Sequence, residues 1–480
     1  MHSAKFIEVL KTFSKQEFKR FGTMIISPYF NSEKVLVMLY SILKNHYPDF
    51  SGKGMDKHTV FKKLYPGKDY NDVLMRNVFS DMLKLTEDYL LIESYKNDEF
   101  DSRLRLANEL SRRKLIKLYQ KNLDKAEVLV ADKKAKDINY FKKILLIEQS
   151  KKSHEVTHKD IYINPNNTEQ QISDSITIIF LMEILYRNLQ LINIQKKYDF
   201  NYRLNFEKEI DQFLENSGRM YLEIAYIKYY YYTFKLLRSQ DQKYYILLKD
   251  LIKTGIDELS PLEIRDIFTS LSNYCYVRIT NGEDGFIKEL FLNQKEMIYH
   301  NIYTTAAGNI PNVFFMNIVT TGLESEEILW VEQFIRERGE ELKDDSKADT
   351  LHFCNAQLSY FKKDYDSALR ELSAINVDDM TYKHNTKSLY LKLYFELNDI
   401  ETFLSHVDSY KHFIAKNKLV FDKIKDSINN YIIFANRIFC IKNEIGKYDQ
   451  YNLPELKREI IKCSPLINRP WLLRKIAEIE

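Results

Sequence analysis

Glycine and proline are scarce in this sequence, with 12 glycines and 9 prolines among 480 residues. That is about a third of their combined average usage. Tight turns, bulges and phosphate-binding loops depend on these residues. The chain therefore has too few of them for a β-sandwich, barrel or propeller. The glycine-dependent motifs G-x-G-x-x-G, G-x-x-x-x-G-K-[ST] and G-x-S-x-G are also missing, which argues against a nucleotide site or a serine hydrolase.

Cysteine and long apolar runs are equally rare. The cysteines are far apart and form no C-x-x-C pair, which argues against a disulfide framework or a zinc knuckle: they are Cys275, Cys354, Cys440 and Cys463. The most apolar run, Ile176 to Tyr186, is interrupted by Glu183 and is shorter than the ~20 residues of a membrane span. The N-terminal residues include no signal-peptide pattern. We expect a cytoplasmic protein that needs no cofactor and does not enter a membrane.

Charge is nearly balanced overall but unevenly distributed. The chain has 71 Lys and Arg, 68 Asp and Glu, and 45% hydrophobic residues, as a folded soluble protein does. Residues 1–150 carry 28 Lys and Arg against 20 Asp and Glu, so the excess of basic residues lies there. This mild excess allows an anionic partner but is smaller than in many nucleic-acid-binding domains.

Residues 1–100 have the pattern of an N-terminal helical domain. Ser14 and Glu17 have the spacing of a capping box. Further helices are expected at about Ser32–Tyr47 and Asp56–Tyr65, and one more from Asn71. The last has apolar residues at helical intervals, which predicts one buried stripe: Leu74, Val78, Met82, Leu85 and Tyr89.

Residues 101–165 are predicted to form a basic helical hairpin followed by an exposed loop. We expect one long helix over Leu104–Val130 and another over Asn139–Gln149. The polar stretch Lys151–Gln171 contains Asn164-Pro165-Asn166-Asn167, which is typical of a loop.

Residues 166–480 are predicted to be an α-solenoid of tetratricopeptide-like helix pairs with a C-terminal cap. Three second helices begin with an acidic residue and carry a leucine five residues later, and a looser match has its leucine six residues after Asp284, at a period of 35–40 residues. These leucines are Leu290, Leu329, Leu369 and Leu404. Helix breaks are expected at Gly218, Asn281-Gly282, Gly308, Gly322 and Asn398. The stretch Phe361–Leu369 looks like the middle of a tetratricopeptide repeat, although no repeat carries the full set of signature residues.

Two groups of short motifs resemble a family of uncharacterised all-helical proteins from Bacteroidetes-type bacteria. They are Phe18-Lys-Arg-Phe21, Ser27-Pro-Tyr-Phe-Asn31, Tyr65-Pro-Gly67, Tyr70-Asn-Asp72 and Arg76-Asn77, and then Leu391-Lys-Leu-Tyr-Phe-Glu-Leu397, Asp408-Ser-Tyr-Lys-His412 and Trp471-Leu-Leu473. The resemblance would cover nearly the whole chain. It implies a helical fold and brings no activity, cofactor or catalytic residue.

A basic stripe is the first candidate site. Arg113, Lys117, Lys121 and Lys125 are four residues apart and would follow one helix face, where they could contact phosphates. The preceding region Asp56–Glu93 has the order of a helix-turn-helix. However, its second helix is rich in acidic residues, which phosphate would repel. The simpler interpretation of the stripe is a solvated outer face with acidic residues interleaved as ion-pair partners.

Two further motifs are candidates for a site. His154-Glu155-Val156-Thr157-His158 matches H-E-x-x-H, in which two histidines bind zinc and the glutamate is the general base. Its polar flanks and the lack of a histidine at position 164 favour a solvated helix end or loop instead. The run Tyr229–Tyr232 covers every side of a helix, so some tyrosines should pack in the core. Tyr226, Tyr230 and Tyr231 are the candidates for a protein-binding surface.

The interpretation that these patterns favour is a non-enzymatic scaffold that binds a protein or peptide along a helical-repeat surface. The alternative is a nucleic-acid-binding transcriptional regulator that uses the basic N-terminal region. A zinc-dependent hydrolase at His154 and His158 is a minor alternative. The sequence does not identify the partner or the oligomeric state.

Overall fold

The protein is all-α. The structure, a computed structural model, describes residues 4–52, 54–131, 133–158, 168–198, 201–283, 285–304, 308–376, 380–416, 422–446 and 453–480. These residues form 23 α-helices and three short 3-10 helices, and within the same ranges there is no β-strand. The helical fold predicted from the scarcity of glycine and proline is confirmed.

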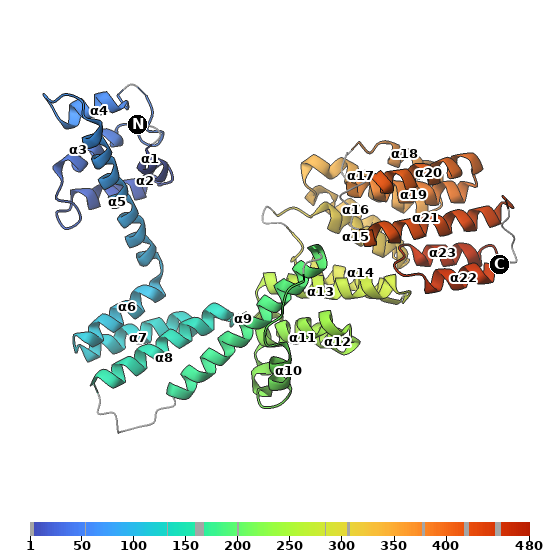
Figure 1. Cartoon of the computed structure of the whole chain (residues 1–480), viewed down its shortest axis with the longest axis horizontal. Helices are drawn as coiled ribbons and strands as arrows, with labels where there is room; N and C mark the ends of the chain where they lie inside the picture. Colours follow the sequence, from blue (N-terminus) through green and yellow to red (C-terminus); the bar gives the residue numbers. More distant parts are fainter. Residues whose placement is uncertain are drawn as a thin grey trace. The chain divides into compact units, whose positions relative to one another are not determined.

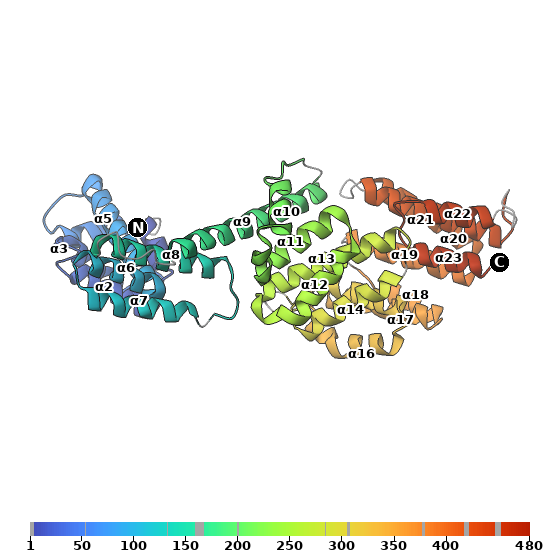
Figure 2. The same ribbon diagram turned by 90° about the horizontal axis from the view of Figure 1, so that it is seen from below.

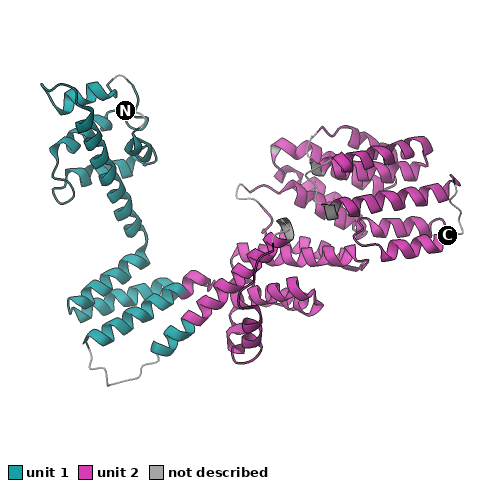
Figure 3. Ribbon diagram, in the orientation of Figure 1, with its two compact units in different colours: residues 1–133, 142–175 teal, residues 134–141, 176–480 magenta. Residues whose placement is uncertain are grey.

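The chain divides into two compact units (Figure 3). Unit 1 comprises residues 1–133 and 142–175, and unit 2 comprises residues 134–141 and 176–480. The predicted division at residues 100 and 165 is finer, because it separates the N-terminal domain from the basic hairpin. Both of those regions lie largely in unit 1.

Unit 1 contains seven complete helices, most of α8 and the beginning of α9 (Figure 1). They are α1 (Lys5–Leu10), α2 (Lys15–Ile26), α3 (Lys34–Lys44), α4 (Lys57–Leu64), α5 (Asp72–Asn97), α6 (Glu99–Arg112), α7 (Ile116–Ala131), α8 (Ile138–His158) and α9 (Thr168–Tyr198), of which α9 continues into unit 2. Helices α1 to α5 enclose one apolar core. Helices α6 and α7 pack together as a hairpin, against which α8 lies.

Local sequence signals explain several boundaries in unit 1. The Ser14 hydroxyl accepts a hydrogen bond from the backbone N–H of Glu17, and the Glu17 carboxylate accepts one from the N–H of Ser14, so the capping box that begins α2 is confirmed. The predicted stripe on α5 is also buried, with Leu74 half-buried and the other four residues in the core.

Unit 2 contains the other helices. They are α10 (Glu207–Glu215), η1 (Arg219–Glu223), α11 (Ala225–Ser239), α12 (Gln242–Gly255), η2 (Ile256–Glu258), α13 (Pro261–Thr280), α14 (Gly285–Tyr299), α15 (Asn312–Glu324), α16 (Ile328–Arg338), η3 (Gly339–Glu341), α17 (Asp344–Phe361), α18 (Tyr365–Ser373), α19 (Met380–Leu397), α20 (Ile400–Lys416), α21 (Asp422–Lys442), α22 (Leu453–Lys462) and α23 (Arg469–Ala477). Most consecutive helices pack together, and α11, α15 and α17 also pack on the next helix but one. Figures 1 and 2 show α20 to α23 side by side.

Two details of the expected repeat are wrong. Gly322 lies inside α15 and not at a break. A Cβ atom at this position would lie 2.6 Å from the Val331 side chain and 3.0 Å from the Phe291 ring. This glycine permits close helix packing. Leu329 is 83% exposed, although it was expected to anchor the core. Asp364 and Asp399 cap the N-termini of α18 and α20, five residues before Leu369 and Leu404. Helix α16 begins only at Ile328, so Leu329 is its second residue and does not occupy the position that those two leucines have.

The last helix, α23, contacts helices far back along the chain. The Trp471 indole N–H donates to the Tyr360 hydroxyl on α17 over 2.8 Å, and Arg474 pairs with Glu324 on α15 over 2.8 Å. The Lys475 ammonium pairs with Glu396 on α19 over 2.7 Å. The C-terminal helix therefore fastens three earlier helices of unit 2 together.

Candidate functional site

The basic hairpin differs from its prediction in one important way. The expected helix Leu104–Val130 is two helices, α6 and α7, that reverse direction at Lys114, whose φ of 62° lies in the left-handed region. Arg113 lies in that turn and its guanidinium pairs with Glu109 over 2.8 Å. The predicted stripe of four cations on one helix is therefore wrong, because Arg113 does not share the face of the three lysines.

Three of the predicted cations do form a basic face on α7. Lys117, Lys121 and Lys125 are exposed, and among the residues that the structure describes their ammonium groups have no ion-pair partner. Exposed apolar side chains lie on the same side of the helix, at 100° per residue: Leu118, Val128 and Leu129. The face is accordingly both basic and apolar.

The H-E-x-x-H motif ends helix α8 and does not lie in a loop. The helix continues from Ile138 to His158, so the loop expected from Lys151 onward is wrong for residues 151–158 and 168–171, and the Asn164–Asn167 tract lies outside the described residues. The two imidazoles meet at Ser111: His154 Nδ1 is 2.7 Å from the hydroxyl, and His158 Nε2 is 2.8 Å from the backbone carbonyl. The His154 ring also stacks on Tyr119 at 3.9 Å.

These contacts give the histidines a packing role between α8 and the hairpin. Across the described ranges, no group of three or more His, Cys, Asp or Glu side chains is placed to hold a metal ion. Among the residues that the structure describes, the two histidines therefore have no third protein ligand of the kind that a catalytic zinc site uses.

The three tyrosines predicted to form a protein-binding surface are core residues of unit 2. Tyr226, Tyr230 and Tyr231 are only 2%, 8% and 3% exposed. Burial raises the pKa of Tyr226 to about 12, with a smaller contribution from the nearby Glu263 carboxylate. An open tyrosine surface at these positions is therefore wrong. Tyr230 borders a cavity.

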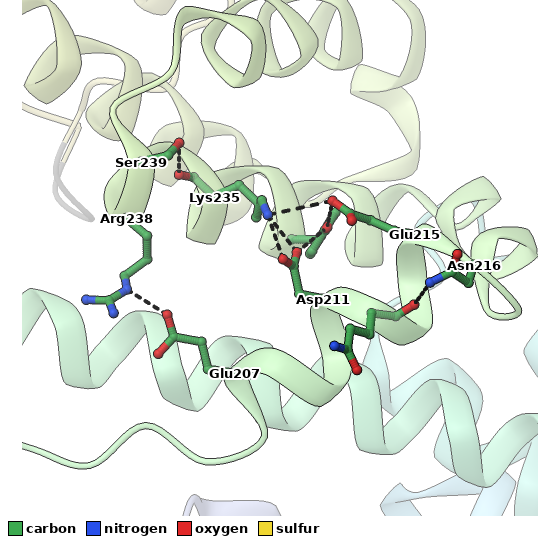
Figure 4. A network of polar contacts seen from close by, with 9 residues as sticks. Glu207, Asp211, Glu215, Asn216, Lys235, Arg238 and Ser239 are labelled. Atoms are coloured by element: carbon green, nitrogen blue, oxygen red, sulfur yellow. Dashed lines mark hydrogen bonds and ion pairs between the residues drawn. The ribbon is translucent and has the colours of Figure 1, made fainter.

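A network of ion pairs fastens α10 to α11 (Figure 4). Tyr231 also contributes to this network. Its hydroxyl donates to Asp211 over 2.6 Å, and the Lys235 ammonium pairs with the same carboxylate over 2.7 Å. Arg238 pairs with Glu207 one turn away, over 2.8 Å. Burial alone would raise the pKa of Asp211, but the hydrogen bonds from Lys235 and Tyr231 outweigh it and hold that pKa below its usual value. Lys235 is shared between Asp211 and Glu215, and Arg238 pairs with Glu207, so each charged group has an ion-pair partner and the network holds α10 against α11.

A cavity of about 260 Å³ lies where α9, α11 and α13 meet, bordered also by the first residue of α8. Tyr229 and Tyr230 from α11 are buried in its wall, with ring centroids 4.7 Å apart. Tyr186 from α9 and Leu262 from α13 lie at its edge and are 37% and 54% exposed. The cavity therefore has an aromatic wall and an apolar rim that is open to solvent.

Two carboxylates, Glu263 and Asp266, line the same cavity from one turn of α13. Glu263 accepts hydrogen bonds from the hydroxyls of Ser260 and Tyr226. For the half-buried Asp266 carboxylate, no hydrogen bond or ion pair is formed with any described residue. Burial raises the pKa of Asp266, and the neighbouring Arg265 only partly opposes that shift.

Sequence patterns did not reveal this cavity. The only signal was the i, i+3 spacing of Glu263 and Asp266, which places two acids on one helix face. Tyr186 and Asp266 are 80 positions apart in the sequence, and helix packing brings them together.

One described helix passes the length and hydropathy test for a membrane span. It covers Thr168–Gln195 of α9, 28 residues with a mean hydropathy of 1.4, and is longer than the apolar run expected there. Of its most apolar window, 44% of the residues are buried in the protein. Leu181, Met182 and Leu185 belong to the core of unit 2, and core helices commonly pass the same test.

The sequence matches no family model, and no curated protein or solved structure matches it significantly. Function is therefore argued from the residues and their geometry.

Proposed function

We propose that the protein is a non-enzymatic scaffold that binds a protein or peptide along the surface of unit 2. In this proposal, helices α11 to α20 form an α-solenoid of tetratricopeptide-like pairs. The packing of most helices on the next one, and of α11, α15 and α17 on the next but one, supports it, as does the aspartate cap that begins α18 and α20. The four free cysteines, three of them buried, suit a reducing compartment, and we propose a cytoplasmic location.

The observation that carries the proposal is the cavity with the exposed rim of Tyr186 and Leu262. Protein interfaces are enriched in aromatic residues and have an apolar centre, and the tyrosine wall and the exposed apolar rim of the cavity fit that pattern. In the networks around Tyr231 and Lys475 each lysine pairs with two carboxylates, which suits a structural role. Binding therefore explains this surface better than catalysis does.

Affinity purification of the full chain from its native cells tests the proposal, with two matched variants. Leu262→Glu places a charge on the cavity rim, and Leu329→Glu places the same charge on α16, where the leucine is 83% exposed. Both sites are solvent-facing, so both variants should fold. We expect a partner that is retained by wild type and by Leu329→Glu and is lost by Leu262→Glu. Recovery of the bait alone, or a partner that ignores both changes, contradicts the proposal.

A second candidate function is nucleic-acid binding by unit 1. The favouring observation is the set of exposed lysines on α7 that lack ion-pair partners among the described residues: Lys117, Lys121 and Lys125. If they contact phosphates, replacing all three by glutamine should weaken binding to a generic DNA duplex. The slope of log K against log salt concentration should also become shallower by about one per lost contact. The absence of binding by wild type even at low salt removes this candidate.

A further inference from the structure

We propose that the cavity between α9, α11 and α13 receives the cationic side chain of a lysine or arginine from the partner protein. The inference rests on the scaffold function proposed above and specifies the chemistry of its site. Three features of the cavity carry it: its volume, its uncompensated negative charge and its aromatic lining.

The volume matches one side chain. At about 260 Å³, the cavity is below the roughly 300–1,000 Å³ typical of pockets for cofactors and drug-sized ligands. It is nevertheless open at the rim formed by Tyr186 and Leu262. A side chain projecting from a docked protein can enter such an opening while the backbone of the partner stays outside.

The charge of the lining favours a cation. Glu183, Glu263 and Asp266 contribute three carboxylates, and Arg187 is the single cation among the lining residues, all of which the structure describes. Arg187 lies 3.8 Å from Glu183 and is largely exposed. Glu263 already accepts two hydroxyl groups. The Asp266 carboxylate is thus the desolvated acceptor that remains.

A desolvated carboxylate without a donor is costly, and a ligand that supplies the donor recovers that cost. A lysine ammonium or an arginine guanidinium would do so with a charge-assisted hydrogen bond. An anionic side chain would be repelled by Glu263 and Asp266. A neutral apolar side chain would fill the space but remove water from Asp266 without pairing it.

The aromatic lining favours a cation independently of Asp266. The rings of Tyr186 and Tyr230 have centroids 5.8 Å apart, and Tyr229 packs beside Tyr230. A cation within about 6 Å of a ring centroid is attracted to the face of the ring. One such contact already exists at the rim, since the Arg187 guanidinium lies 5.4 Å from the centroid of Tyr186.

Small probes test the chemistry on the full chain. The N-acetyl methylamides of lysine and arginine are compared with those of norleucine and citrulline, which have similar shapes and no charge, by ligand-observed NMR titration. We expect both cationic probes to bind about tenfold more tightly than the neutral ones. Equal binding of charged and neutral probes, or no binding of the cationic probes at millimolar concentration, overturns the inference.

Asp266→Asn removes the charge with little change in shape and should weaken binding of the lysine probe about tenfold. Its control is Asp257→Asn, which removes an exposed carboxylate outside the cavity and should leave binding unchanged. Tyr186→Leu, at an exposed position, should weaken binding severalfold and provides a second variant if Asp266→Asn fails to fold. Unchanged binding in whichever of these variants folds contradicts the inference.

Two further results show whether the cation comes from a partner protein or from a free amine, and whether the scaffold proposal or the cationic-site proposal has failed. n-Butylammonium should bind more weakly than the lysine probe; equal affinity indicates a site for free amines and overturns the assignment to a partner protein. A partner that is lost by Leu262→Glu but retained by Asp266→Asn supports the scaffold and refutes the cationic site. Failure to recover any partner refutes the scaffold and, with it, the assignment of the cation to a partner protein.

Discussion

Lysine side chains have opposite roles on α7 of unit 1 and on α23 of unit 2. Lys117, Lys121 and Lys125 are exposed, and no ion-pair partner for them lies in the part of the chain that the structure describes. Lys475 is 8% exposed and is held by Glu396 and Glu478 over 2.7 and 2.6 Å. Exposed charges contribute little to stability and remain available to a partner, whereas buried paired charges hold helices together. Asp266 fits neither case, because it is half-buried and forms no hydrogen bond or ion pair with any residue that the structure describes, and we propose it for that reason as the binding group.

The largest expected difference in the free energy of unfolding is between a variant of the buried Lys475 and a variant of the exposed Lys121. Lys475→Ala leaves Glu396 buried without its cation and should lower the free energy of unfolding by about 3 kcal/mol. Lys121→Ala on α7 should change it by less than about 0.5 kcal/mol. Differential scanning calorimetry of both variants makes the comparison. Equal shifts in melting temperature would contradict the contrast between the two regions.

Acid should destabilise unit 2 through two histidines of α19 and α20. Burial lowers the pKa of His384 from 6.5 to about 4, and it also lowers the pKa of His406. The unfolded chain therefore binds protons that the folded chain does not, so stability is full above pH 6.5 and falls as the pH decreases toward 4. The loss from His384 is about 3 kcal/mol at most.

The measurement is the melting temperature between pH 7 and pH 4.5 for wild type and His384→Gln, since glutamine can still hydrogen-bond the Tyr410 hydroxyl that lies 2.7 Å from His384 Nδ1. The variant should show the shallower decline. Parallel curves would mean that His384 is already protonated in the folded protein.

A smaller difference in stability is expected between variants of Asp211, which pairs with Lys235, and of Asp266, which has no such partner among the described residues. Asp211→Asn weakens the bonds to Lys235 and Tyr231 and should cost about 1–2 kcal/mol. Asp266→Asn removes a charge that has no partner and should leave the melting temperature unchanged or slightly higher. A substantial loss of stability in Asp266→Asn would indicate that its carboxylate is already compensated in the free protein.

The sequence predicted what depends on local chemistry. The helical class, the Ser14–Glu17 capping box and the buried stripe of α5 all follow from propensity and spacing within one helix. The errors arose where one residue has two structural uses. A glycine predicts a break at position 322, but there it permits close helix packing, and the turn at Lys114 has no glycine or proline to mark it.

The candidate site could not be predicted in the same way. The tyrosine run is plain in the sequence, but its burial depends on α9 and α13 packing against α11, and periodicity within one helix does not encode that packing. The lack of a partner for the Asp266 carboxylate among the described residues likewise depends on how α9, α11 and α13 pack together.

Site-specific photo-crosslinking tests the central claim, that unit 2 binds a protein at the rim of the cavity, most directly. A benzophenone amino acid is placed at position 262 in one protein and at position 329 in another, since both leucines face solvent. In native cells, position 262 should form a covalent adduct with one partner, and position 329 should not. Adducts at position 329 but not at 262, or at neither position, would contradict the account.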